Sequence, residues 1–596
     1  MKLISFAFAS MLSVCCETNA VAMERESPSI LITEQGPEFR QFSRVEITGS
    51  SIVNPKSKLA LPVRVIDRKE IDRSGARSTP ELLQALPMMS SFSELGGFNP
   101  SGFGGGGYQS AAIRGYEKGT LILINGRRLA PVTLQRQDTD RSTSDLMLLP
   151  MSAIDRVEIL SDGASSLYGS DAIAGVVNII TKSETRGLQV FAEGQHFDVA
   201  NKNGHHVGLA WGNGQLGRDG YNLQAHFSAS HTPGLYFKDL PWATLQSRFE
   251  RNDANGKPLY FRPVMSEFGD IGKTSQPTEQ AGDCPAGHEY ALRQQSASYT
   301  GAPVYRCLAP SLRNMHLYPE QNTQQLHLQF ERRLENGHAL FSEISRQEID
   351  TKYHYGRNTT ATIASSSMPS VLIDLESWNP QTRLQNTIHK RFVLGSHGQW
   401  QDWDYKLSYS NSANSDDFWI EGGLITNSTA GWNSLLSPYA QELLLPLNNA
   451  SAGLASALNS QQLDDRRQRI LETSAKELNL TASRKLGETD WGDIQLGTVF
   501  FDLKQNFRYV SWEGADYPDY QNTRHNIGVA GELQVPAWDK LDLTLSMRGE
   551  RYSDFGSILT GKLGGKYTLS DQAFLRASTG TGFRAPTLSQ MSKVST

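Results

Sequence analysis

The residues that most often form catalytic or metal-binding sets do not form one in this sequence. The thirteen histidines are scattered, and the closest pair, His205 and His206, would point to opposite faces of a strand. The glycine-rich run from Gly102 to Gly107 lacks the Lys-Ser/Thr pair and the following helix of a phosphate-binding loop. We therefore expect no catalytic residue, no bound metal, no cofactor and no enzymatic activity.

Another group of side chains suits ligand binding. The segment from residue 127 to residue 149 carries four arginines and two glutamines, a donor-rich set that fits an anionic chelate or a hydroxyl-rich ligand. Each of these side chains taken alone could equally be a solvated polar residue. Together with a tyrosine from the preceding loop, the candidate ligand-binding residues are Tyr108, Arg127, Arg128, Gln135, Arg136 and Arg141.

The N-terminus is typical of an export signal. Lys2 supplies the positive charge, Leu3 to Val14 form a short apolar core, and Ala20 to Ala22 form a small-residue cleavage pattern. Residues 1–22 are therefore the expected signal peptide, and the mature chain is expected to begin at Met23. The alternative, a lipoprotein signal that ends at Cys15, fits poorly because valine precedes that cysteine.

Two of the four cysteines would remain after cleavage. Cys284 and Cys307 are an even pair in an exported chain, and an oxidising compartment favours a disulfide worth about 3 kcal/mol. Two unrelated thiols are the alternative. Zinc would need more ligands than the neighbouring His288 provides.

Composition limits the class of protein. The chain has 596 residues, of which 38% are hydrophobic, and its mean hydropathy is −0.42. No apolar run approaches the ~18 residues that a spanning helix needs, which excludes an α-helical membrane protein but not a β-barrel. The net charge of −5, from 57 basic and 62 acidic residues, does not indicate the basic surface that nucleic-acid binding requires.

From about residue 187 the hydrophobic pattern alternates with a period of two. In the segment from Tyr221 to Ser230 the apolar and polar residues alternate strictly, and the segment from Leu541 to Arg551 repeats the pattern. Such runs are longer than the strands of a soluble sandwich, and short turns alternate with long connections. The pattern predicts roughly thirteen strands of a large antiparallel outer-membrane barrel, with apolar side chains outside and polar side chains inside.

The preceding part of the chain predicts a small mixed α/β domain. Its most informative stretch, residues 154–182, reads IDRVEILSDGASSLYGSDAIAGVVNIITK and combines two strands, a short helix and a Tyr-Gly turn. The Asn125-Gly126 dipeptide predicts a tight hairpin. The elements expected here are strands at 63–66, 121–124, 157–160 and 176–180, and helices at 69–74, 80–86 and 164–167, with Thr79 starting the second helix.

These residues resemble a known family. YGS at 168–170, GVVNI at 175–179 and the Ile113-Arg114-Gly115 tripeptide resemble the plug domain of TonB-dependent outer-membrane receptors. The resemblance implies a plug at 51–183 inside the lumen of a transmembrane barrel formed by residues 187–596, in the cell outer membrane. GTGFRAPTL at 580–588 resembles a motif well inside such barrels, which close with about 22 strands. We therefore expect the C-terminal strands to be missing from this sequence.

The resemblance also implies a function and its residues. It implies import of a scarce ligand, an iron-siderophore or similar metal chelate, with import of a carbohydrate or peptide, or a non-transporting receptor or adhesin, as alternatives. The expected partners are TonB, outer-membrane lipid and a small extracellular ligand. The lead at 23–50 would end in an exposed TonB box, and plug arginines would pair with barrel glutamates. The residues are Val45, Glu46, Ile47, Thr48 and Gly49 for the box, and Arg114, Arg156, Glu532 and Glu550 for the lock.

Overall fold

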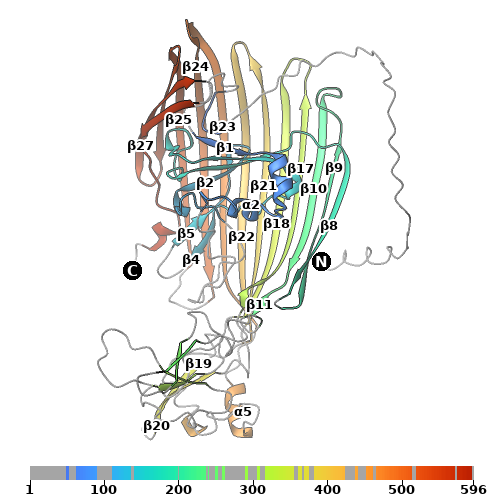
Figure 1. The fold of residues 1–596 in the computed structure, drawn as a ribbon, viewed down its shortest axis with the longest axis vertical. Coiled ribbons are helices and arrows are strands. Elements are labelled where there is room, and N and C mark those ends of the chain that lie inside the picture. Colours follow the sequence, from blue (N-terminus) through green and yellow to red (C-terminus); the bar gives the residue numbers. More distant parts are fainter. Residues whose placement is uncertain are drawn as a thin grey trace, which may run out of the picture.

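A curved wall of long antiparallel strands with a small mixed domain against its inner face forms the fold in the computed structural model (Figure 1). The structure describes residues 48–52, 62–89, 110–135, 140–198, 200–236, 316–354, 382–422, 465–512, 519–570 and 573–593, with short pieces of the connections between them. The signal peptide and most of the N-terminal lead lie outside the described residues.

The small domain is built on a five-stranded sheet of order β1-β6-β7-β2-β3. β2 pairs with β7 in parallel, and the other neighbours are antiparallel. All five residues of β2 are buried, as a continuous apolar run predicts for an inner strand. The strands are β1 (Val63–Ile66), β2 (Thr120–Ile124), β3 (Arg127–Arg128), β6 (Ile154–Leu160) and β7 (Gly175–Thr181).

Three short helices complete this domain at or near their expected positions. α1 (Arg68–Ser74) is capped by Asp67, and α3 (Ser165–Tyr168) follows β6. α2 (Thr79–Gln84) begins one residue earlier than predicted, because the Ser78 hydroxyl, and not that of Thr79, accepts the capping hydrogen bond from the backbone N–H of Glu81.

The predicted hairpin forms between β2 and β3. Asn125 and Gly126 have φ angles of 52° and 77°, the positive values that a type I′ turn requires at both central residues. The Asn125 side chain also donates to Glu343 of the large sheet, at 3.0 Å. The turn therefore places the adjacent arginines of β3 against the wall.

The wall is a single antiparallel sheet of thirteen strands, the number expected from the sequence. Its outer strands are β8 and β28, and consecutive members are neighbours throughout. The strands are β8 (Gly187–Phe197), β9 (Lys202–Asn213), β10 (Tyr221–Thr232), β17 (Glu320–Arg333), β18 (Ala339–His354), β21 (Thr382–Trp400), β22 (Trp403–Glu421), β23 (Arg466–Thr489), β24 (Gly492–Ser511), β25 (Tyr520–Trp538), β26 (Leu541–Tyr552), β27 (Gly556–Ser570) and β28 (Ala573–Gly580).

The two faces of the wall have the predicted polarity. In β10, Asn222 and Gln224 are 1% and 2% exposed on the inner side, whereas Leu223 and Phe227 are 41% and 38% exposed on the outer side. The inner polar side chains are covered because the small domain lies against them. This is the arrangement of a barrel wall whose apolar face contacts lipid.

Connections at the two ends of the wall differ in length. Short turns such as 334–338 and 401–402 lie at one end, and β19, β20 and α5, which belong to longer connections, lie at the other (Figure 1). No described helix is both long and apolar enough to cross a membrane. The smaller elements are β4 (Val132–Gln135), β5 (Asp140–Thr143), β11 (Leu235–Tyr236), β12 (Phe249–Asn252), β13 (Pro258–Phe261), β14 (Glu289–Leu292), β15 (Tyr305–Leu308), β16 (His316–Tyr318), β19 (Thr360–Ser365), β20 (Met368–Asp374) and α5 (Ala452–Asn459).

Candidate functional site

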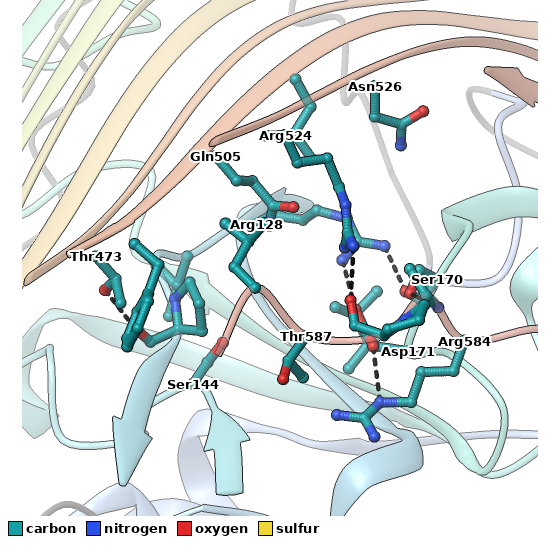
Figure 2. A pocket seen from close by; sticks show the side chains of 18 of the residues that line it. Arg128, Ser144, Ser170, Asp171, Thr473, Gln505, Arg524, Asn526, Arg584 and Thr587 are labelled. Carbon is teal, nitrogen blue, oxygen red and sulfur yellow. Dashed lines mark hydrogen bonds and ion pairs between the residues drawn. The ribbon is translucent and has the colours of Figure 1, made fainter. Parts of the chain in front are cut away.

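A pocket of about 100 Å³ lies where the small domain meets β23, β24 and β25. The small domain contributes residues of β3 and of the turn after α3, and the segment that follows β28 closes another side. Figure 2 shows three guanidinium groups, those of Arg128, Arg524 and Arg584, around this space. The other labelled lining residues are Ser144, Ser170, Asp171, Thr473, Gln505, Asn526 and Thr587.

The three arginines of the pocket are held by fixed partners. Arg128 donates to the carbonyl oxygens of Tyr168 and Ser170, both at 2.6 Å, and lies 3.4 Å from Asp171. Arg584 reaches the same aspartate at 3.2 Å, and Arg524 pairs with Asp554 at 2.6 Å. Lys118 also lines the pocket, so four cations face two carboxylates, which leaves two positive charges for an anionic ligand.

The segment after β28 attaches the turn around α3 to the wall. The backbone N–H of Ala585 donates to the Ser170 hydroxyl at 3.0 Å, and that of Phe583 donates to the Ser165 hydroxyl at 3.4 Å. On β26, Arg548 donates to the carbonyl oxygen of Leu167 at 2.8 Å. The DGASSLYGSDA sequence is therefore the part of the small domain that binds the far end of the sheet.

Asp162, just before α3, forms an ion pair with the wall. Lys562 on β27 donates to its carboxylate at 2.7 Å, and Ser578 on β28 donates at 2.8 Å. Burial alone would raise the pKa of Asp162, but these two hydrogen bonds, the charge of Lys562 and the backbone N–H of Gly163 together hold the pKa below its ordinary value of 3.8. Sequence reasoning missed this pair.

The lowered pKa predicts acid sensitivity of the attachment. A carboxylate with a depressed pKa contributes its full stabilisation above its ordinary pKa of 3.8 and loses it as the pH falls through the lowered value. We expect Asp162→Asn to lower the urea midpoint for release of the small domain at pH 6, and to lower it much less at pH 3. Asp198→Asn, at a side chain that is 96% exposed, is the control. An equal effect of Asp162→Asn at both pH values would contradict the assignment.

Two deeply buried ion pairs share one carboxylate of the wall, and one of them joins β3 to the wall. Glu343 on β18 lies 3.1 Å from Arg127 and 2.6 Å from Arg391 on β21. The side chains of these three residues are at most 5% exposed. Arg127 was predicted to bind ligand. The structure places it instead in this buried contact, because the hairpin turn directs β3 toward the wall.

The predicted lock is wrong in its partners. Among the described residues, no ion pair joins Arg114 or Arg156 to Glu532 or Glu550. Arg156 pairs with Asp155 at 3.0 Å and with Glu158 at 2.7 Å, within the small domain, and Glu550 pairs with Arg548 on its own strand at 2.6 Å. The two glutamates do face the inner side as predicted, with 1% and 5% exposure. Strand alternation could predict that direction but not the partner.

The end of the predicted TonB box is buried, not exposed. The backbone N–H and the hydroxyl of Thr48 donate to Glu158 at 2.7 and 2.6 Å, and the N–H of Gly49 donates to the Tyr168 hydroxyl at 3.0 Å. Two residues further on, the N–H and hydroxyl of Ser51 donate to Glu532 at 2.6 and 2.9 Å. We call residues 48–51 the docked segment. It connects a carboxylate of the small domain with one of the wall.

The docked segment lines a larger cavity of about 510 Å³ on the other side of β3. Arg127 and Glu343 line it together with residues of β17, β22, β23 and β24. Because Arg128 lines both this cavity and the 100 Å³ pocket, β3 separates the two spaces.

Several predicted site residues lie outside the described part of the chain or have only their backbone described. Tyr108, Arg136 and Cys284 lie outside the described residues, as do the first three residues of the TonB box, Val45 to Ile47. Gln135 lies in β4, Arg141 in β5 and Cys307 in β15, but only their backbones are described. The ligand contacts and the disulfide that were predicted for these residues remain predictions.

Comparison with known families matches both parts of the chain. Residues 55–176 match the model of the TonB-dependent receptor plug domain, and residues 342–595 match that of the TonB-dependent receptor-like β-barrel. Over 140 residues the chain is 33% identical to the vitamin B12 transporter BtuB of Photobacterium profundum. That alignment covers 23% of this chain and 20% of the transporter.

Solved structures share the fold at low identity. The siderophore receptor PirA from Acinetobacter baumannii matches with a TM-score of 0.52 and 15% identity, and the alignment covers 88% of this chain and 61% of that one. The ferric enterobactin receptor PfeA from Pseudomonas aeruginosa matches with a TM-score of 0.53 and 15% identity, over 89% and 62%. The chain thus spans less than two thirds of the length of these receptors.

A wall with an apolar outer face, and a mixed α/β domain held against its polar inner face, define a plugged outer-membrane barrel. The two family matches fall on the same two parts of the chain. The chain belongs to the TonB-dependent receptors, which are outer-membrane receptors and transporters and not enzymes. From here on, the small domain is called the plug.

Proposed function

We propose that the chain is part of an energised importer of an anionic metal chelate, of which an iron-siderophore is the leading example. The observation that carries this proposal is the excess positive charge at the pocket, where Lys118, Arg128, Arg524 and Arg584 face only the carboxylates of Asp171 and Asp554. Rigid, charge-assisted donors of this kind suit a ligand with several anionic oxygens. The chemistry is recognition and passage, without a covalent step.

The energy for passage would come from TonB, which members of this family work with. We propose that TonB pulls on Val45 to Gly49 by pairing with it as an added strand. The pull would detach the docked segment from Glu158 and Glu532, and the 510 Å³ cavity beside it would then receive the ligand. In this proposal β3 is the barrier between binding and passage.

A ligand-binding experiment tests the pocket. We expect Arg584→Gln to weaken binding of an anionic ferric chelate such as ferric enterobactin by about tenfold, because one of the three guanidiniums is lost. If the chain binds vitamin B12, the same substitution should leave that binding unchanged. Fluorescence quenching on the purified chain measures both ligands. The matched control is Arg346→Gln on the outer face, where the arginine pairs with Glu348.

Two results would contradict the proposal. One is equal binding of the ferric chelate by the wild-type chain and the Arg584→Gln variant. The other is tight binding of only neutral ligands. A neutral carbohydrate or peptide would then be the better candidate, because the glutamine and asparagine side chains in the pocket also suit hydroxyl-rich ligands.

A further inference from the structure

Two lysines face each other on the outer surface of the wall. Lys476 on β23 and Lys504 on β24 are directly opposite in register. Both are exposed, whereas Ala475 and Leu503 beside them are 3% and 4% exposed on the inner face. Within the described part of the chain, neither lysine forms an ion pair. The outer surface therefore presents two uncompensated ammonium groups next to each other.

This arrangement is unfavourable in the protein alone. Side chains directly opposite on antiparallel strands have Cβ atoms about 5 Å apart, and like charges at this spacing destabilise the pair. The repulsion is not relieved by a direct ion pair, because Glu472 pairs with Arg508 at 2.9 Å and Asp502 is hydrogen-bonded to His525 at 2.8 Å. An anion that accepts from both lysines would remove it.

The position of the lysines along the strand indicates which anion. Trp491, in the short turn between β23 and β24, is 46% exposed at the periplasmic end, and Phe500, nine residues further along, is 37% exposed on the outer face. At about 3.3 Å per residue and a strand tilt of about 40°, Phe500 lies about 23 Å above Trp491, near the top of an apolar band about 25 Å tall. Lys504 follows four residues later, at the level of the outer-leaflet headgroups.

A third lysine lies nearby on the outer surface. Lys390 on β21 is exposed and stands opposite Arg346 in register, but the arginine is neutralised by Glu348 at 2.5 Å. β21 and β23 are separated by one strand and Lys390 is level with Ser474, so Lys390 lies about 12 Å from Lys476 across the sheet. Below this row the outer face is apolar, with Leu478 and Phe392 42% and 40% exposed. The outer surface thus places three lysines directly above an apolar face that acyl chains can contact.

We propose that Lys476 and Lys504, with Lys390 beside them, bind the phosphorylated headgroup of an outer-leaflet glycolipid whose acyl chains lie on the apolar band. One phosphate bridges the lysine pair, and a second phosphate on the same headgroup reaches Lys390. The bridge replaces repulsion by two charge-assisted hydrogen bonds, and it holds β23 and β24 together on the side of the wall that faces away from the plug.

Titration of the purified chain with fluorescent lipopolysaccharide tests this site. We expect the double variant Lys476→Gln/Lys504→Gln to bind about tenfold more weakly than the wild-type chain, because both bridging donors are lost. The double variant Lys476→Arg/Lys504→Arg should bind within about twofold of wild type. Lys540→Gln, in the short turn between β25 and β26 at the other end of the wall, removes one exposed positive charge away from the site and should leave affinity unchanged.

Two further arms identify the source of the phosphate. Enzymatic removal of the lipid phosphates should weaken binding to the wild-type chain at least as much as the glutamine double variant does, because the contact of Lys390 is lost as well. Inorganic phosphate at equal phosphate concentration should not displace the glycolipid, because it lacks the acyl chains. Unchanged binding of the dephosphorylated glycolipid, unchanged binding by the glutamine double variant, or full displacement by inorganic phosphate would each overturn the proposal. The dephosphorylation arm remains decisive if the double variant does not fold.

Discussion

Ile47→Pro is expected to abolish ligand uptake while ligand binding stays nearly unchanged. Proline removes a backbone donor and cannot continue a strand that is added to the edge of another protein's sheet. Ile47 directly precedes Thr48, the first residue of the docked segment, so a strand formed with TonB at this position would transmit its pull to Glu158. Cells that carry the receptor and a radiolabelled ferric chelate would give both surface binding and uptake.

A matched proline substitution controls for effects of the lead itself. Thr33→Pro changes a residue fourteen positions earlier, outside the predicted box, and uptake should be unchanged. Normal uptake by the Ile47→Pro variant would show that the segment pulled by TonB lies elsewhere. Loss of binding together with uptake would instead indicate damage to the pocket.

Glu343→Gln is expected to lower the free energy of unfolding of the plug against the wall by about 3–5 kcal/mol. The substitution leaves Arg127 and Arg391 buried without their shared carboxylate, and uncompensated buried charges are costly. Urea-induced exposure of the plug, followed by limited proteolysis, measures the loss. The effect should be largest for β3, which carries Arg127.

A similar substitution on the outer face provides the control. Glu348 pairs with Arg346 on the same strand, but these side chains are 30% and 41% exposed. Glu348→Gln should therefore cost less than about 1 kcal/mol. Equal losses for both substitutions, or no loss for Glu343→Gln, would contradict the assignment of Arg127 and Glu343 as the main buried contact between plug and wall.

Local patterns predicted the elements well because short-range physics determines them. The apolar run of β2, the Asn125-Gly126 turn and the alternation of β10 each depend on residues close in sequence, and each is present as predicted. The small error at α2 has the same origin, since Ser78 and Thr79 can both cap a helix.

Contacts between distant segments could not be predicted in the same way. Alternation correctly placed Glu532 on the inner face, but its partner is Ser51, 481 residues away. Likewise Arg127 was predicted to bind ligand, yet it is buried in an ion pair with Glu343. Nothing in a single sequence indicates that these two residues are partners. Pairing of this kind requires the register between plug and wall, and that register is a property of the whole fold.

The hydrogen bonds of the docked segment are arranged in series along the chain. Thr48 is bonded to Glu158, Gly49 to Tyr168, and Ser50 and Ser51 to Glu532. A pull from the N-terminal side therefore loads these hydrogen bonds one group after another and not all at once. The peak force is then determined by the strongest single group and not by the sum, so a modest force acting over a longer distance is sufficient to free the segment.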